Sequence, residues 1–217
     1  AIEKRKPLMS DSTIQFIQNK RFQPFFNSFK LTEAWVSGMI SNFEYLMMLN
    51  VYSGRSFNNA SQYPLMPWIL TDYISPEIHF DDEKIYRDLS KPIGALNPER
   101  LDDYISDYKS YESEGMPAFM YSSAPISPLS LFLYLIRQEP FTTLHTEMQG
   151  GRFDNAARLF LSIKKTFDTV TSLKGDFREL IPEFFFLPEF LQNKNHFNLG
   201  KVNPEGTSDD PKDATVP

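Results

Sequence analysis

The sequence contains no cysteine among its 217 residues. This absence excludes disulfide bonds, thiolate nucleophiles, iron–sulfur clusters and zinc sites built from cysteine. It also fits a reducing compartment, so we expect a cytoplasmic protein. The histidines His79, His145 and His196 are far apart and show no short metal-ligand spacing. We therefore expect structural or surface roles for them, and neither a bound metal nor a cofactor.

The sequence also lacks a long hydrophobic run. Its longest apolar stretches, "LFLYLI" and "FFFLP", fall far short of the roughly 20 residues that span a bilayer. The first residues, "AIEKRKPLMS", lack the apolar segment of a signal peptide. We therefore expect a soluble chain that contacts membranes only peripherally.

The sequence shows no basic face either. The formal net charge is −6, and the one basic cluster, residues 3–7, is typical of a linker rather than of a phosphate-binding patch. Aromatic residues do not alternate with lysine and arginine as they do in nucleic-acid readers. We therefore expect no nucleic-acid partner.

Common catalytic and nucleotide-binding motifs are missing too. The sequence has no GxSxG, GxxxxGK[ST] or GxGxxG. The stretch "QGGRFD", residues 149–154, places two glycines before an expected helix, and we interpret it as a turn rather than as an anion site. Glu183 and Glu189 lie among apolar residues, which can raise a carboxyl pKa for acid catalysis. They can equally accept hydrogen bonds inside an irregular core, so a hydrolase using Glu183 and Glu189 remains an alternative.

Aromatic residues, in contrast, are abundant. Phenylalanine, tyrosine and tryptophan make up 15% of the chain, which indicates a core of large rings. Between residues 52 and 126 prolines recur so often that long helices are not expected through most of this region.

Helices are expected on both sides of the proline-rich region, and one within it. The first is one helix over 32–50 with Thr32 as N-cap, Gly38 as its weak point and an apolar stripe that includes Trp35 and Met39. Further helices are expected over 97–111 (N-cap Asn97), from 127 on (N-cap Ser127) and over 153–170 (N-cap Asp154), with an Asp176/Glu179 capping box before short helical pieces in 180–191.

These patterns predict a mainly α fold, with helices packed around an irregular core of extended, non-regular segments. Buried backbone in such segments needs hydrogen-bond partners, and polar side chains have to supply them. The stretch "YRDLSKPIGALN", residues 86–97, mixes charges with apolar residues without any regular period. Since an arginine offers five donors to nearby carbonyls, we interpret this stretch as part of a polar network in the core. Its members are expected to be Arg55, Arg87, Asp88, Lys91 and Asn97.

Four stretches together resemble one family. "ISNFEYLMMLN" with "GRSFNNASQYPLMPWIL", "YRDLSKPIGALN", "LYLIRQEPFT…QGGRFD" and "ELIPEFFFLPEFLQNKNHFNLG" are similar to the BEACH domain (beige and Chediak–Higashi), in the family's order. The resemblance implies helices around extended core segments and no established enzymatic activity. It also implies a large cytosolic scaffold protein in which a pleckstrin-homology-like domain precedes the BEACH domain and WD repeats follow it.

The resemblance also implies a function and a site. We expect a scaffold module that acts in vesicle and lysosome-related membrane traffic or autophagy, peripherally associated with endomembranes. Its expected partners are the adjacent pleckstrin-homology-like domain and other trafficking proteins, with a peripheral lipid-binding module as a further alternative. The groove for the neighbouring domain is expected to include aromatic and charged residues of the first helix. From this helix Asn42, Glu44 and Tyr45 join the candidate residues for partner binding or the polar core.

The sequence departs from the family at two places. Met120 and Ala124 stand where histidines are common, so no chemistry is expected from those histidines. The family continues with an LPPWA-like motif and further helices beyond the point where this sequence stops, so we expect a domain that is truncated at its C-terminus. The expected division is a lead-in at 1–31, the BEACH domain at 32–200, and a disordered acidic tail or linker at 201–217.

Overall fold

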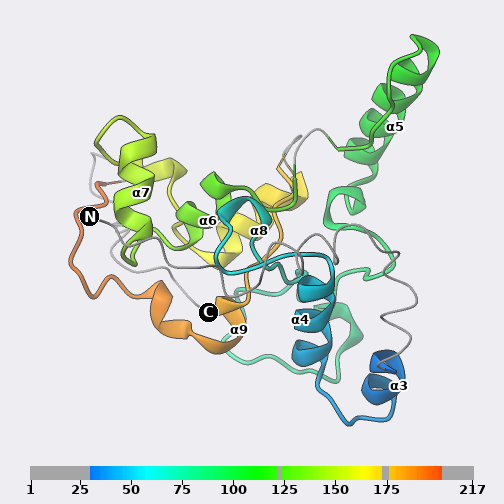
Figure 1. The fold of residues 1–217 in the computed structure, drawn as a ribbon, viewed down its shortest axis with the longest axis horizontal. Coiled ribbons are helices and arrows are strands. Elements are labelled where there is room, and N and C mark those ends of the chain that lie inside the picture. Colours follow the sequence, from blue (N-terminus) through cyan, green and yellow to red (C-terminus); the bar gives the residue numbers. More distant parts are fainter. Residues whose placement is uncertain (1–29, 122–123, 173–175, 202–217) are drawn as a thin grey trace, which may run out of the picture. The chain divides into compact units, whose positions relative to one another are not determined.

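The computed structural model in Figure 1 describes residues 30–121, 124–172 and 176–201. Regular structure within these residues is helical, with no strand, so the predicted mainly α fold is confirmed. The α-helices described are α3 (Leu31–Val36), α4 (Asn42–Tyr52), α5 (Pro98–Ser113), α6 (Pro128–Tyr134), α7 (Phe141–Met148), α8 (Ile163–Ser172) and α9 (Glu183–Phe186). Short 3₁₀ turns lie at Ala60–Gln62, Glu83–Ile85, Ile93–Ala95, Ala156–Arg158 and Pro188–Leu191.

The chain divides into two compact units, Ala1–Pro64 and Leu65–Pro217. The basic cluster at residues 3–7 and the tail beyond residue 201 lie outside the described residues. The domain boundaries expected from the sequence stay predictions.

The first unit contains α3 and α4, and the prediction of one helix over 32–50 is wrong. Gly38 has φ 74°, in the left-handed region that ends helices, and α3 has already stopped at Val36. A new helix, α4, then begins at Asn42, with Ser41 as its N-cap. The Ser41 hydroxyl accepts from the Glu44 amide while the Glu44 carboxylate accepts from the Ser41 amide. Thr32 lies inside α3 and is not its N-cap. The local capping signals therefore outweigh the apolar period that runs through them.

In the second unit two predicted helix starts are confirmed. The Asn97 side chain accepts from the amide of Arg100, and α5 begins at Pro98. The Ser127 hydroxyl likewise accepts from the Ser130 amide, and α6 begins at the following proline. Proline suits the first helical position because its missing N–H is not needed there. α5 ends at Ser113, two residues beyond the expected range of 97–111.

The helix predicted over 153–170 is wrong in its first half. Residues Ala156–Arg158 form a 3₁₀ turn, and α8 starts only at Ile163. The Asp154 carboxylate accepts from the next amide, that of Asn155, and caps no α-helix. The glycines of "QGGRFD" follow α7, a helix that the sequence did not predict. The Gly151 amide donates to the Thr146 carbonyl of α7 at 2.7 Å. The stretch is a turn, as interpreted, but it closes a helix instead of opening one.

The capping box predicted at Asp176 and Glu179 is also wrong. The Asp176 carboxylate lies 2.7 Å from the guanidinium of Arg178, and the Glu179 carboxylate accepts from the amide of Trp68 at 3.0 Å. Neither carboxylate therefore caps a helix: that of Asp176 pairs with Arg178, and that of Glu179 binds the backbone of a distant extended segment. α9 begins later, at Glu183.

Extended segments form the centre of the second unit, as predicted. The Trp68 side chain is wholly buried, with its ring 5.5 Å from that of Phe167, and its indole N–H donates to the Arg178 carbonyl at 2.9 Å. Next to it Met66 and Leu180 exchange backbone hydrogen bonds of 2.8 and 2.9 Å in an isolated bridge. Aromatic packing and scattered hydrogen bonds thus replace a sheet.

Candidate partner-binding residues and the buried polar network

The eight candidate residues divide between the two units. Asn42, Glu44, Tyr45 and Arg55 lie in the first unit, and Arg87, Asp88, Lys91 and Asn97 lie in the second.

In the first unit an aromatic cluster joins α3 to α4. The indole N–H of Trp35 donates to the Asn42 side-chain carbonyl at 2.7 Å. The Trp35 ring stacks on that of Tyr45 at 4.7 Å between centroids, and the Tyr45 hydroxyl lies 3.1 Å from that of Thr32. Glu44 holds the start of α4 through its bond to the Ser41 amide, which lowers the pKa of its carboxyl. We call Trp35, Asn42 and Tyr45 the α3–α4 cluster.

Apolar side chains next to this cluster are exposed. Val36 and Met39 are each 74% exposed, and Trp35 is 38% exposed. The prediction of one apolar stripe through Trp35 and Met39 is therefore wrong, because α3 ends between them and a spacing of four no longer puts them on one helix face. Exposed apolar residues next to aromatic rings are typical of surfaces that bind other proteins.

Arg55 has a local structural role. Its guanidinium donates to the Tyr63 carbonyl at 3.1 Å, and its partial burial lowers its pKa. Tyr63 is buried, and its ring meets the edge of Phe57. Arg55 therefore satisfies a carbonyl in the irregular segment that follows α4.

In the second unit Arg87 is buried and bonds to backbone carbonyls. Its Nε donates to the carbonyl of Trp68, and its Nη1 donates to those of Asp88 (3.1 Å) and Lys91 (2.5 Å). Its own amide donates to the Ile69 carbonyl at 2.9 Å. Arg87 thus joins two extended segments that share no regular ladder.

The side chains of Asp88 and Lys91, in contrast, are exposed and pair with each other at 3.4 Å. The Asp88 carboxylate also accepts from the Ser90 hydroxyl and amide, which lowers its pKa. They bond locally rather than to the core backbone, and water and salt screen an exposed pair of this kind.

Arg100, which no sequence pattern singled out, is buried at the start of α5. Its Nε donates to the Gly94 carbonyl at 3.0 Å, and its Nη1 donates to the carbonyls of Val170 (2.7 Å) and Asp176 (3.1 Å). The only sequence signal was its spacing of four from Tyr104, which is also buried. Asn97 supports the same region as the N-cap of α5.

Glu183 and Glu189 lie in different surroundings. Glu183 is buried, 6% exposed, whereas Glu189 is exposed. Neither carboxylate lines the cavity of about 530 Å³ at residues 96–99 and Thr171, or that of about 380 Å³ at 153–156 and 198–201. The geometry in the described residues gives no support to a paired-carboxylate hydrolase.

Among the histidines only His145 is buried. Neither of its ring nitrogens has a hydrogen-bond partner among the described residues, and its ring stacks on Phe153 at 6.4 Å. Burial lowers the pKa of His145, and the charge of Asp154 partly opposes that shift. His79 and His196 are exposed. Within the described ranges no group of three or more His, Asp or Glu residues could hold a metal ion.

These features define a class of protein: a helical domain whose extended core is held by buried arginines and large aromatic rings. The family model of the Beige/BEACH domain matches residues 33–217, and the chain belongs to this family.

Two relatives illustrate the match. BEACH domain-containing protein B of Arabidopsis thaliana is 46% identical over 168 residues, which cover 77% of this chain and 6% of the relative. BEACH domain-containing protein lvsE of Dictyostelium discoideum is 46% identical over 178 residues, covering 80% of this chain and 8% of the relative. The chain thus spans a small part of the curated relatives it matches, and neither of their names describes an enzymatic activity.

Proposed function

We propose that this chain is a non-enzymatic protein-interaction module of a large BEACH-type scaffold protein, acting in vesicle and lysosome-related membrane traffic or autophagy. The supporting observation is the α3–α4 cluster, where ordered aromatic rings adjoin the exposed side chains of Val36 and Met39. Aromatic anchors with fixed geometry bind partners at a low entropic cost.

The proposed partner is a pleckstrin-homology-like domain of the same full-length protein, with other trafficking proteins as further partners. Family membership supports this proposal. The net charge of −6 disfavours a nucleic acid as the partner. The proposed location is the cytoplasm, peripherally at endomembranes. Within residues 30–121, 124–172 and 176–201 no helix is long and apolar enough to cross a membrane.

Isothermal titration calorimetry of this chain with the purified pleckstrin-homology-like domain tests the proposal. We expect measurable binding that weakens by about tenfold or more in the double variant Val36→Ser/Met39→Ser. Val51→Ser is the matched control, because this residue is also exposed but lies on the opposite side of α4 from Asn42. Circular dichroism of each variant checks that α3 and α4 remain folded.

Three results would contradict the proposal. The domain could fail to bind the wild-type chain, the double variant could bind as tightly as the wild type, or Val51→Ser could weaken binding equally. Co-sedimentation with vesicles of phosphatidylcholine and phosphatidylserine tests the lipid-binding alternative. Binding to vesicles that rises with phosphatidylserine content and is lost in the double variant would assign these side chains to a lipid surface instead.

A further inference from the structure

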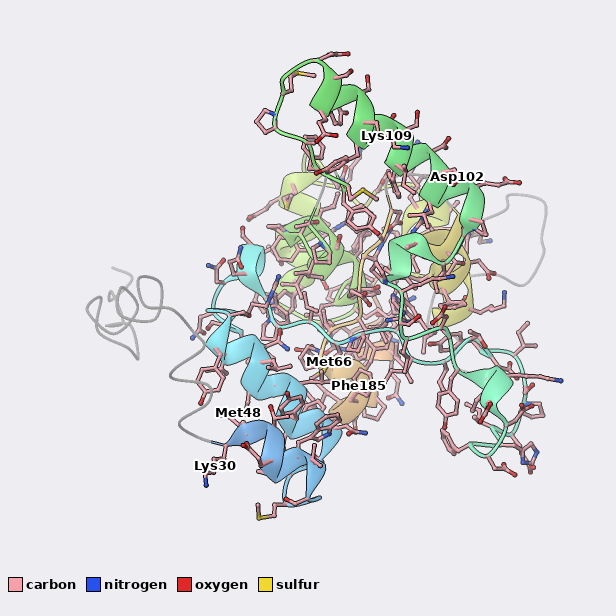
Figure 2. All side chains as sticks on the ribbon, turned by 90° about the vertical axis from the view of Figure 1, so that its right-hand side faces the viewer. Lys30, Met48, Met66, Asp102, Lys109 and Phe185 are labelled. Atoms are coloured by element: carbon pink, nitrogen blue, oxygen red, sulfur yellow. The ribbon has the colours of Figure 1, made fainter. Side chains whose placement is uncertain are left out.

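Residues 72–84 of the second unit form a closed loop. At its base the Thr71 amide donates to the Ile85 carbonyl at 2.7 Å, and the Thr71 hydroxyl donates to the same oxygen at 3.0 Å. Leu70 and Tyr86, the residues just before Thr71 and just after Ile85, form an isolated antiparallel bridge. In Figure 2 this loop, in turquoise at the lower right, stands away from the helices of its own unit. Compact loops with joined ends are frequently functional.

The loop exposes two large apolar side chains. Ile74 is 71% exposed and Phe80 is 67% exposed, more than any other large apolar side chain described in this unit. A single exposed apolar residue needs no explanation, but two such residues on one short closed loop are a candidate anchor pair.

Hydrogen bonds fix the backbone at both anchors. The amide of Ile74 donates to the Asp72 carboxylate at 3.0 Å, and the carbonyl of Phe80 accepts from the Tyr86 hydroxyl at 2.9 Å. Between the base and the first anchor, Tyr73 packs its ring against those of Trp68 (5.7 Å) and Phe167 (5.2 Å) in the core. The loop is therefore ordered before any partner arrives, which reduces the entropy that binding has to overcome.

Acidic residues flank the anchors along the loop. The loop contains Asp72, Glu77, Asp81, Asp82 and Glu83 against one lysine, and all of these carboxylates except that of Asp72 belong to exposed residues. An acidic rim complements lysine and arginine on a partner and repels an anionic lipid surface. It also disfavours a second copy of this chain, whose net charge is −6.

We propose that loop 72–84 is a docking element for a partner protein that offers an apolar pocket edged with lysine and arginine. Ile74 and Phe80 enter the pocket, and Glu77, Asp81 and Glu83 face its basic rim. This surface belongs to the second unit and does not include the α3–α4 cluster.

Selection from a phage-displayed library of random dodecapeptides against the 217-residue chain tests the proposal. We expect enriched peptides that combine aliphatic or aromatic residues with lysine or arginine. By fluorescence polarisation they should bind Ile74→Ser/Phe80→Ser about tenfold or more weakly than the wild type. The control Leu89→Ser, an exposed apolar position of the same unit outside the loop, should bind normally. Glu77→Gln/Asp81→Asn should weaken binding and reduce its dependence on salt.

Several outcomes would overturn the proposal. Selection might enrich no peptide, or the enriched peptides might bind the loop variant and the wild type equally well. Two further measurements test other occupants with the same variants. If vesicles of phosphatidylcholine or phosphatidylserine bind the wild type but not the loop variant, loop 72–84 binds a lipid surface instead of a protein. If the wild type sediments as a dimer and the loop variant as a monomer, the occupant is a second copy.

Discussion

The guanidinium of Arg100 lies 2.7 Å from the carbonyl oxygen of Val170, 70 residues further along the chain. Val170 is in the last turns of α8, where carbonyls have no partner within the helix. Arg100 sits in the first turn of α5 and bonds to the Gly94 carbonyl as well. One side chain therefore connects the end of one helix, the start of another and the 3₁₀ turn before it.

Arg100→Ala should accordingly destabilise the domain strongly. The change leaves buried carbonyls without donors, which costs about 3 kcal/mol or more in total. Urea unfolding followed by tryptophan fluorescence measures the loss. Lys109→Ala is the matched control, because Lys109 is exposed on the same helix (Figure 2) and its removal should change stability by about 0.5 kcal/mol at most. If the two changes lower the free energy of unfolding equally, the hydrogen bonds of Arg100 do not stabilise the domain.

Arg87→Ala should destabilise the domain to a similar extent, because the carbonyls of Trp68, Asp88 and Lys91 lose their donor. Arg87→Lys should recover only part of the stability, since an ammonium cannot reproduce the fork of the guanidinium. Asp88→Asn serves as the control, because that exposed side chain can still accept from Ser90. If the Arg87→Ala protein is soluble and has the urea midpoint of the wild type, Arg87 has no structural role and is better assigned to a binding surface.

Gly94→Ala should destabilise the domain through a collision with Tyr121. A Cβ at position 94 would lie 2.5 Å from Cε1 of Tyr121. That ring cannot retreat easily, because it packs against Tyr104 at 5.1 Å and Phe177 at 4.6 Å. Overpacking of this kind costs about 1–3 kcal/mol.

A double-mutant cycle tests whether the collision is the cause. Tyr121→Leu removes the ring, so adding Gly94→Ala to it should cost much less than adding Gly94→Ala to the wild type. Urea unfolding of the four proteins gives the coupling. If the two changes simply add, backbone preference at residue 94, and not the Tyr121 ring, accounts for the loss.

The sequence predicted the structure best where its signals were local. Asn97–Pro98 and Ser127–Pro128 each contain a cap and a first helical residue, and both helices begin there. It failed where the partner of a polar group is distant. The Glu179 carboxylate accepts from the Trp68 amide, 111 residues away in sequence, and no local pattern separates that role from capping.

The same limit applies to the candidate site. Arg87 was predicted as a core residue because its segment matched no regular period. Burial of the arginine with backbone carbonyls as its partners then explained a charge among apolar residues. Arg100 was overlooked because a charged residue in a regular helix already fits a solvated face. Asp88 and Lys91 share the segment of Arg87 yet lie exposed, since alternation along an irregular segment has no fixed period.

The pH dependence of stability should report on His145. Its pKa is lowered by burial, so the folded protein resists protonation of this ring while the unfolded chain, with a pKa of about 6.5, accepts it. Stability contributed by the neutral ring is therefore fully present above about pH 6.5. It declines as pH falls from that value toward the lowered pKa of the folded state, because the unfolded state binds more protons throughout this range.

Replacing the ring should remove this part of the pH dependence. His145→Leu introduces an apolar side chain of similar size and removes two buried nitrogens that have no hydrogen-bond partner among the described residues. The urea midpoint should therefore fall less between pH 7.5 and pH 5.5 in His145→Leu than in the wild type. His196→Asn, at an exposed position with φ 54° that asparagine tolerates, should retain the wild-type pH dependence. If His145→Leu loses as much stability on acidification as the wild type, His145 is accessible to protons in the folded state.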